Sequence, residues 1–596
     1  MHLATIDWGV MALYGVVVLA VGLYFTRRAG EDTNAYFLAG RTLPWWVLGT
    51  SMVATTFSTD TPNLVTDIVR TNGVSGNWVW WAFALTGMLT VFFYAKLWRR
   101  SEVVTDLEFY ELRYSGKPAA FLRGFRAVYL GVFFNTMILA TVTLAAIKIG
   151  GVLLGASPVQ VVLVAGAVTV LYSATSGLWG VVATDLMLFV LALVGAVAAA
   201  VVAVGHPDVG GLAALLDHPA LEGKTSFLPD FSDWDTALAV FIVPIAVQWW
   251  STWYPGSEPG GGGYNAQRML AARSEDDSLK AILWFNVAHY GVRPWPWVLV
   301  ALASMVVYPT LDSIQAAFPG LDPSILGHDL AYPAMLVFLP PGLLGLVVAS
   351  LAAAYMSTVS THLNWGASYV VQDVYRRFVS PTASEAHYVW VARVTTVGLT
   401  VLMGAVALGL SNALQAFDIL LQIGAGTGLV FLLRWFWWRI NAWSELSAMV
   451  ISFVVAVWLT GGLWGLTWAA PDWDSSTSLV MAVLITSVGW IAVTLLTPPA
   501  DAATLERFVR KIRPQGPGWA PVRARMDGPA VGAEGGDGSL SAAALSWFLG
   551  CVAVYAALFG VGYLIYGQVG IGLAVLALAL ASSVGVMRLF PKVGVR

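Results

Sequence analysis

Apolar segments of about 20 residues recur throughout this chain of 596 residues, and they constrain its fold more than any other feature. Hydrophobic residues make up 58% of the sequence and charged residues 11%, with a mean hydropathy of +0.73. Soluble domains carry about 25% charged residues. A membrane β-barrel would show short alternating segments, which the sequence lacks. We therefore expect an all-α polytopic membrane protein embedded in the lipid bilayer.

Hydropathy predicts about fifteen transmembrane helices. Their approximate ranges are 8–25, 43–69, 77–98, 122–150, 158–175, 179–204, 236–255, 280–308, 334–371, 388–409, 414–437, 444–466, 478–496, 544–566 and 568–590. Lys and Arg gather in alternate connections, one cluster being Arg268, Arg273 and Lys280. The positive-inside rule assigns these connections to the cytoplasm. The chain is therefore predicted to begin outside and end inside (N-out, C-in), in the inner or plasma membrane of the cell.

Two spans contain residues that break helices. Span two carries Asp60 and Pro62 among several hydroxyl side chains, and span seven carries Pro244 and Pro255 before a glycine run. Such breaks are tolerated at membrane depth where the freed backbone lines a cavity or meets an ion. The two spans are five apart, so they enter the membrane from opposite sides. This is the pattern of two five-span repeats in inverted topology.

The repeats divide the chain into six parts. These are an extra N-terminal span (1–30), repeat one with spans two to six (43–204), repeat two with spans seven to eleven (236–437), two further spans (444–496), a cytoplasmic linker (498–543) and a C-terminal two-span hairpin (544–596). The linker is rich in Pro, Gly and charge, so we expect a tether without a fold of its own. The single cysteine, Cys551, excludes an intrachain disulfide.

Small oxygen-bearing side chains form a stripe within the apolar segment 351–378. They are Ser357, Thr358, Ser360, Thr361 and Asn364, and positions 357, 360, 361 and 364 share one helix face. One interpretation is that these groups bond carbonyls one turn back or a neighbouring helix. The other is an oxygen cage for a small hard cation. The repeat order places this helix against broken span two, which favours the cage.

Charged groups inside membrane spans are costly and are functional candidates by default. Asp60 lies in the break of span two, where Asp-Thr-Pro is also a good helix start. Asp185, early in span six, would supply the negative charge of an ion cage or simply lie near the inner interface. Span eight contains His289 and Arg293. An arginine at this depth needs a carboxylate, for which Asp60 is our hypothesis, or an anionic solute.

Tryptophans occupy two kinds of position. Those at span ends, including Trp80 and Trp435, are typical of interfacial belts. Trp249, Trp250 and Trp253 flank the break of span seven instead, where aromatic walls would suit sugar rings or organic solutes, although packing alone would also explain them. The following glycine run lacks the Lys and hydroxyl residue of a phosphate-binding loop, so we expect a flexible turn.

These motifs together resemble the sodium:solute symporter family, relatives of bacterial sodium/galactose, sodium/proline and sialic acid symporters. The resemblance covers roughly residues 5–440. It rests on YFLAGRTLPWWVLGTSMVAT at 36–55, the Thr-Asp pair at 184–185, NAQRMLAARS at 265–274 and STVSTHLNWGASYVVQDVYRRF at 357–378. The fold that it implies is that of the leucine transporter, in agreement with the inverted repeats.

The resemblance also implies sodium sites. A common site would use the carbonyl oxygens of Ala54, Phe57 and Ala354 and the hydroxyls of Ser357 and Thr358. Some relatives hold a second sodium ion, and the matching positions here are Asp185, Ser357, Ser360 and Thr361. We therefore expect Na+ as the coupling ion and no organic cofactor.

The solute is less well defined. Sugar-transporting relatives imply contacts from Asp60, Thr61 and His289, but those relatives carry a different acidic and amide pair, and a lysine where this chain has His289. Arg293 favours a carboxylate-bearing solute. The three tryptophans of span seven and the sugar-transporting relatives favour a sugar or polyol.

The expected function is sodium-coupled symport of a small organic solute into the cell by alternating access, with no enzymatic activity. A proton-coupled or sodium-independent carrier of the same fold is the main alternative, with Asp60 or Asp185 as the proton site. A nutrient sensor would be expected to append a signalling domain, for which the linker and tail leave no room. An enzyme would need a nucleophile–base pair or a metal cluster, and the histidines are scattered. We expect no nucleic-acid partner and no obligatory protein partner.

Overall fold

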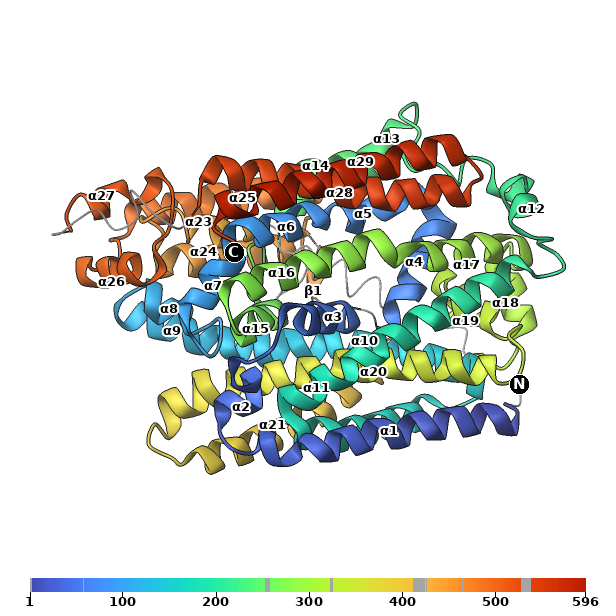
Figure 1. The fold of residues 1–596 in the computed structure, drawn as a ribbon, viewed down its shortest axis with the longest axis horizontal. Coiled ribbons are helices and arrows are strands. Elements are labelled where there is room, and N and C mark those ends of the chain that lie inside the picture. The colour runs from blue at the N-terminus through green and yellow to red at the C-terminus, as the bar shows by residue number, and fades with distance from the viewer. Residues whose placement is uncertain are drawn as a thin grey trace.

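The computed structural model describes residues 3–56, 58–251, 258–321, 325–410, 424, 426–459, 461–463, 466–526 and 538–595. Within these residues, eleven helices are long and apolar enough to cross a membrane. Most of them run along the long dimension of the molecule (Figure 1). Apart from a two-stranded hairpin of β1 (Gly462–Leu463) and β2 (Leu466–Thr467), the described fold is helical. This confirms the all-α class, whereas fifteen spans and the N-out orientation stay predictions.

The helices follow one another along the chain as follows. The first half contains α1 (Thr5–Ala29), α2 (Thr33–Leu38), α3 (Trp45–Thr55), α4 (Asp60–Asn72), α5 (Trp78–Trp81), α6 (Phe83–Leu89), α7 (Ala95–Ser101), α8 (Phe109–Arg113), α9 (Gly116–Val128), α10 (Asn135–Leu154), α11 (Pro158–Val204), α12 (Leu212–Leu216), α13 (Trp234–Ala237), α14 (Val243–Ala246), α15 (Gly263–Ala271), α16 (Glu275–Asn286) and α17 (Pro294–Val307). The second half contains α18 (Leu311–Ala317), α19 (Ala331–Leu336), α20 (Leu343–Ser368), α21 (Glu385–Ala407), α23 (Gly428–Leu433), α24 (Ala442–Leu459), α25 (Ser475–Leu496), α26 (Ala502–Ile512), α27 (Ala520–Arg523), α28 (Leu540–Ile565) and α29 (Val569–Leu589).

The predicted break of span two is confirmed. Helix α3 ends at Thr55 and α4 begins at Asp60, and the two are separate short helices near the centre of the molecule (Figure 1). The Thr56 hydroxyl donates to the Met52 and Val53 carbonyls, at 3.1 and 2.9 Å, and so satisfies acceptors at the end of α3. The break therefore leaves two helix ends facing each other deep inside the bundle.

Span seven is also interrupted. Helix α14 ends at Ala246 and is followed by a single 3-10 turn at Gln248–Trp250, and the next described helix, α15, begins at Gly263. The glycine run between them is buried and not the flexible turn that we expected. A Cβ on Gly261 would lie 2.4 Å from Met269 Cε and 2.9 Å from Trp98 Nε1. The glycines are needed here for close packing against Trp98, whose Nε1 donates to the Gly260 carbonyl at 2.8 Å.

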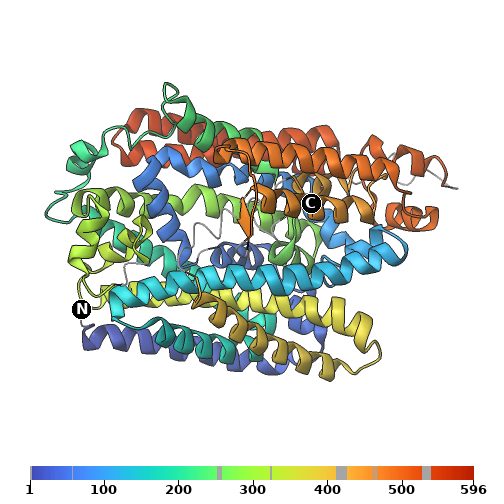
Figure 2. The same cartoon turned by 180° about the vertical axis from the view of Figure 1, so that it is seen from behind.

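Helix α20 is the central element of the bundle. It packs against α1, α3, α10, α11 and α21, and Figure 2 shows it running alongside α10 from the opposite viewpoint. Its N-terminus is held by a residue far away in the sequence, because Asp7 Oδ1 accepts hydrogen bonds from the Gly342 and Gly345 amides, both at 2.7 Å. A carboxylate at this position satisfies free N–H groups and faces the positive end of the helix dipole. Helix α1 is thereby fixed to α20.

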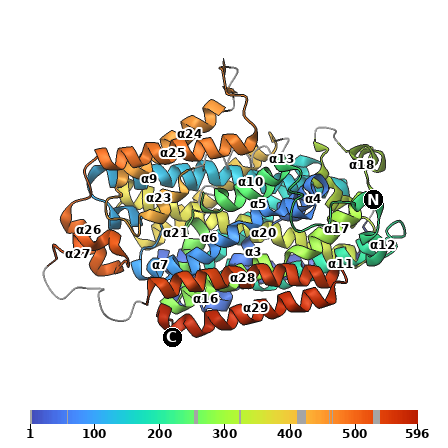
Figure 3. The same ribbon diagram turned by 90° about the horizontal axis from the view of Figure 1, so that it is seen from above.

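The linker 498–543 differs from our expectation, because its described part up to residue 526 folds onto the protein. Helices α26 and α27 lie at one end of the bundle (Figures 1 and 3), and Phe508 and Trp519 are fully buried there. Trp519 Nε1 donates to the Trp435 carbonyl at 2.7 Å, and the Arg113 guanidinium lies 4.6 Å from the Trp519 ring centre. The linker is charged and rich in Pro, but it also contains an amphipathic helix. Composition alone does not reveal such a helix, and for this reason we predicted a tether without a fold.

Gly518 offers a test of this docking. A Cβ at this residue would lie 2.0 Å from the Phe436 carbonyl oxygen, which is a backbone atom. We therefore expect Gly518→Ala to displace α26 and α27 and to increase proteolytic cleavage within 502–526 severalfold, measured by limited proteolysis of the purified protein. Gly570→Ala, where a Cβ meets nothing within 4 Å, is the matched control. Equal cleavage of both variants would contradict the docked arrangement.

Several arginines in the connections between predicted spans are buried in ion pairs. Arg126 pairs with Glu258, the Arg123 and Asp373 side chains are 2.6 Å apart, and Arg434 contacts Glu445. Their charge is compensated by carboxylates inside the protein, so these residues face the protein interior more than the solvent. A positive cluster in the sequence therefore marks a connection between spans without marking an exposed surface.

Candidate ion and solute site

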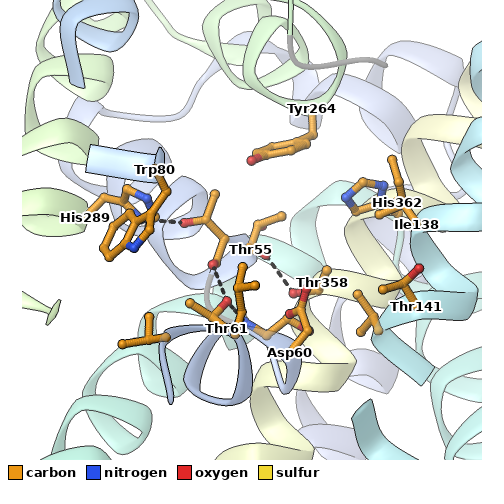
Figure 4. Close-up of a pocket in the computed structure, with 15 residues that line it drawn as sticks. Thr55, Asp60, Thr61, Trp80, Ile138, Thr141, Tyr264, His289, Thr358 and His362 are labelled. Carbon is orange, nitrogen blue, oxygen red and sulfur yellow. Dashed lines mark hydrogen bonds between the residues drawn. The ribbon is translucent and has the colours of Figure 1, made fainter. Parts of the chain in front are cut away.

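The broken end of α3 meets α20 directly. Thr358 Oγ1 on α20 donates to the Thr55 carbonyl on α3 at 2.6 Å, and both residues are buried (Figure 4). Ala54 precedes Thr55, and Ala354 lies one turn before Thr358. The described residues of the predicted common site thus lie on two helices that touch, while Phe57 lies outside the described residues. Neutral carbonyl and hydroxyl oxygens are a donor set that suits a hard monovalent cation.

Three of the four residues of the predicted second site come together beside this contact. Asp185 accepts hydrogen bonds of 2.5 Å from Ser357 and from Ser51 of α3. Thr361 Oγ1 lies 3.1 Å from the Thr55 hydroxyl. Ser360 instead donates to the Ser357 carbonyl within its own helix, at 3.1 Å, as the first interpretation of the stripe predicts. The buried Asp185 carboxylate therefore accepts hydrogen bonds from hydroxyl groups of both α3 and α20.

One residue at this position was not predicted. Arg268 is fully buried on α15, although the sequence placed it in a cytoplasmic cluster. Its Nη2 donates to Thr361 Oγ1 at 2.8 Å and lies 3.9 Å from Asp185 Oδ2. Asn364, the last member of the stripe, accepts a hydrogen bond of 2.9 Å from Gln267 on the same helix α15. The stripe therefore faces a helix of span seven as well as α3.

A pocket opens next to the contact between α3 and α20. Asp60, Thr61 and His289 line it, as do Thr55 and Thr358 themselves (Figure 4). Asp60 Oδ1 is buried and has no hydrogen-bond partner among the residues that the structure describes. Buried polar atoms are nearly always satisfied, so an unpaired carboxylate oxygen in a pocket points to a ligand. The pocket thus includes Thr358, a predicted ligand of the common site, and Thr55, whose carbonyl accepts the Thr358 hydrogen bond.

Arg293 does not line this pocket, and its hydrogen bonds go to backbone carbonyls, while Asp60, the partner that we predicted, interacts with it only electrostatically and not in a direct ion pair. Its Nη1 and Nη2 donate to the carbonyls of Val53 and Thr56, at 2.8 and 3.2 Å, and it contacts His289 Nδ1. These carbonyls are at the C-terminal end of α3, where the helix dipole favours a cation. The backbone carbonyls at the helix break therefore accept hydrogen bonds from the Arg293 guanidinium, for which we had predicted a carboxylate.

The structure does not bring the two described tryptophans of span seven, Trp249 and Trp250, to the pocket. The Trp249 ring lies 6.1 Å from the ring of Trp547 on α28. Trp250 donates to the Ala246 carbonyl at 3.0 Å and packs against apolar residues of α24 and α25. Trp253 lies outside the described residues. The two described rings fill space between helices, in agreement with the packing interpretation.

Other aromatic residues line the pocket instead. Trp80 was interpreted as part of an interfacial belt, but it is 8% exposed and its ring lies 5.7 Å from that of His289. Its Nε1 donates to Asn77 Oδ1 at 2.8 Å. Tyr264, immediately after the glycine run, lines the opposite part of the pocket (Figure 4). For Tyr264 a sequence signal did exist, because it directly follows the glycine run at the break of span seven.

Most of the chain matches the model of a known protein family. The model of the sodium:solute symporter family matches residues 36–452. The chain belongs to the sodium:solute symporter family. Members of this family are transporters and not enzymes, and the family implies sodium as the coupling ion and a small-molecule solute. The helices that carry the predicted ion ligands and Arg268, namely α3, α11, α15 and α20, all lie within the matched range.

Individual relatives are named for different transported solutes. The chain is 30% identical to a sodium/glucose cotransporter of Vibrio parahaemolyticus, over 77% of this chain and 85% of the relative. It is 26% identical to sodium/myo-inositol cotransporter 2 of Mus musculus, over 76% of this chain and 69% of the relative. It is 25% identical to a sodium/sialic acid symporter of Aliivibrio fischeri, over 76% and 88%.

The fold also has a solved counterpart. The outward-open, substrate-bound structure of a sodium-coupled sialic acid symporter superimposes with a TM-score of 0.66 and 21% identity, over 84% of this chain and 99% of the other. This similarity shows the fold of the sodium symporters, which is the leucine-transporter type that we predicted.

Proposed function

We propose that this symporter couples sodium entry to the import of a neutral sugar or polyol across the inner or plasma membrane. The observation that supports this most strongly is the hydrogen bond of 2.6 Å between Thr358 and the Thr55 carbonyl at the edge of the pocket. A sodium ion bound by these oxygens would join α3 to α20. The same residues line the pocket, so the ion would set the shape of the solute site.

The charges around the pocket favour a neutral solute. Among the described residues that line it, none is Lys or Arg, and Asp60 brings a carboxylate. A solute bearing a carboxylate would meet Asp60, and the Arg293 guanidinium is engaged by the backbone of α3. The ionised Asp60 carboxylate only accepts hydrogen bonds, which suits a sugar because the sugar hydroxyl groups can donate them. The rings of Trp80 and Tyr264 supply the apolar walls that organic ligands need.

Alternating access provides the coupling. If sodium and the solute both bind preferentially to the same conformation of the protein, the binding of one favours the binding of the other. An inside-negative potential contributes about 2.3 kcal/mol per charge per 100 mV to sodium entry. The breaks between α3 and α4 and between α14 and α15 support inverted repeats over 43–204 and 236–437, with their broken helices meeting at the site.

Uptake into proteoliposomes tests the proposal. We expect an inward sodium gradient to raise the initial uptake of a radiolabelled hexose or inositol at least tenfold over a potassium control. A library of sugars, polyols and carboxylates, screened by thermal stabilisation with and without sodium, would identify the solute, because a ligand that binds only the folded state raises Tm. Uptake that follows a pH gradient and ignores sodium would overturn the proposal and select the proton-coupled alternative.

A further inference from the structure

The buried arginine on α15 lies among the residues that would hold a second cation. Arg268 Nη2 is 2.8 Å from Thr361 Oγ1 and 3.9 Å from Asp185 Oδ2. Its Nε and Nη2 each lie 3.4 Å from Ser51 Oγ, the hydroxyl that donates to Asp185. A metal ion shared by Asp185 and Thr361 would have to lie between these two side chains. The guanidinium group already lies there.

The charges of this cluster are balanced without a metal ion. Asp185 and Arg268 are both fully buried, and a guanidinium stays protonated in proteins. A buried charge is tolerated when it is paired and hydrogen-bonded. A sodium ion bound by Asp185 and Thr361 would lie directly beside the Arg268 guanidinium, and repulsion between two neighbouring cations in the protein interior is strongly unfavourable.

The common site has a different electrostatic character. Its predicted ligands are carbonyls and hydroxyls, and none carries a charge. Ser357 donates its proton to Asp185, which leaves the lone pairs of the same hydroxyl oxygen available to an ion on its other side. Asp185 therefore orients a ligand of the common site while its own charge is compensated by Arg268.

From this arrangement, we propose that Arg268 is a permanent counter-cation that fills the second cation site, so that each protein molecule binds one sodium ion. This inference rests on the proposed function, because it assumes that the common site binds sodium. It assigns Arg268 as the residue that sets the number of ions per transport cycle. Asp185 becomes a positioning residue and not a sodium ligand.

Equilibrium binding of radiolabelled sodium to the full-length purified protein, without solute, tests the inference. Wild-type protein is expected to saturate at one ion per molecule and Arg268→Gln at two, because the variant leaves Asp185 unpaired and available. The double variant Arg268→Gln/Asp185→Asn is expected to return to one ion. Arg268→Lys, which keeps a cation at this position, is the matched control and is expected to bind one.

Two outcomes do not depend on whether Arg268→Gln folds. Saturation of the wild-type protein at two ions would overturn the inference and leave the proposed function standing. Absence of sodium binding by wild-type protein would overturn both. Thr358→Ala supplies a further check, since removing a ligand of the common site is expected to abolish binding in the concentration range used. One ion that persists with unchanged affinity in Thr358→Ala would place sodium elsewhere and contradict the inference.

Discussion

Thr358→Ala is expected to lower sodium affinity by roughly tenfold to a hundredfold and to make solute uptake nearly insensitive to sodium. The hydroxyl bridges to the Thr55 carbonyl and is a predicted ligand of the common site. Polar contacts to a charged group contribute about 1.5–3 kcal/mol each, and about 1.4 kcal/mol corresponds to a factor of ten. The loss of one neutral ligand out of a small set therefore has a large effect on coupling.

Uptake into proteoliposomes over a series of sodium concentrations measures this effect. Thr358→Ser retains the hydroxyl and should keep most of the activity. Thr400→Ala is the matched control, because Thr400 is a buried threonine on α21 whose hydroxyl bonds the Thr396 carbonyl in its own helix. A sodium dependence in Thr358→Ala equal to that of Thr400→Ala would show that α20 does not hold the coupling ion.

Asp60→Asn is expected to weaken solute binding about tenfold to a hundredfold while leaving sodium binding intact. Asp60 Oδ1 is buried in the pocket without a hydrogen-bond partner among the described residues. The substitution keeps the size of the side chain but replaces one acceptor oxygen by an amide donor, so one of the solute hydroxyls loses its acceptor. The cost is comparable to a lost hydrogen bond to a charged group, about 1.5–3 kcal/mol.

This prediction is specific because it expects Asp60→Asn to weaken solute binding and to leave sodium binding unchanged. Sodium binding and solute binding are measured on the same purified variant, the second by thermal stabilisation with the best solute of the library. Asp67→Asn is the matched control, since Asp67 lies on the same helix, accepts from the Thr71 hydroxyl and does not line the pocket. Solute affinity that is unchanged in Asp60→Asn would remove Asp60 from the solute site.

The elements that the sequence predicted well are those encoded locally. Hydropathy located the long helices, and the cluster of hydroxyls with Asp60 and Pro62 located the break between α3 and α4. The spacing of residues 357, 360, 361 and 364 predicted one face of α20, and Thr361 on this face does contact Thr55 of α3. These features depend on helix periodicity and on the chemistry of neighbouring residues, both of which a single sequence contains.

The features that the sequence did not predict depend on contacts between distant segments. Arg268 lies beside Arg273 and Lys280 in the sequence, so its position resembled a cytoplasmic cluster, yet it meets Asp185 deep in the bundle. Trp80 resembled a residue of an interfacial belt because it begins a span. Periodicity does not tell which helix a side chain faces, and a pairing across more than 80 residues leaves no local signal.

The hydrogen bonds between Asp7 and the N-terminus of α20 connect α1 to the helix that carries the predicted ion ligands. A probe attached to α1 can therefore report on movements of α20. Helix α1 lies at the outer edge of the bundle, and Leu23 on it is 70% exposed. The only native cysteine, Cys551, is buried. A cysteine introduced at Leu23 would thus accept a spin or fluorescent label selectively. Its signal would report displacements of α20 during transport without any alteration of the site itself.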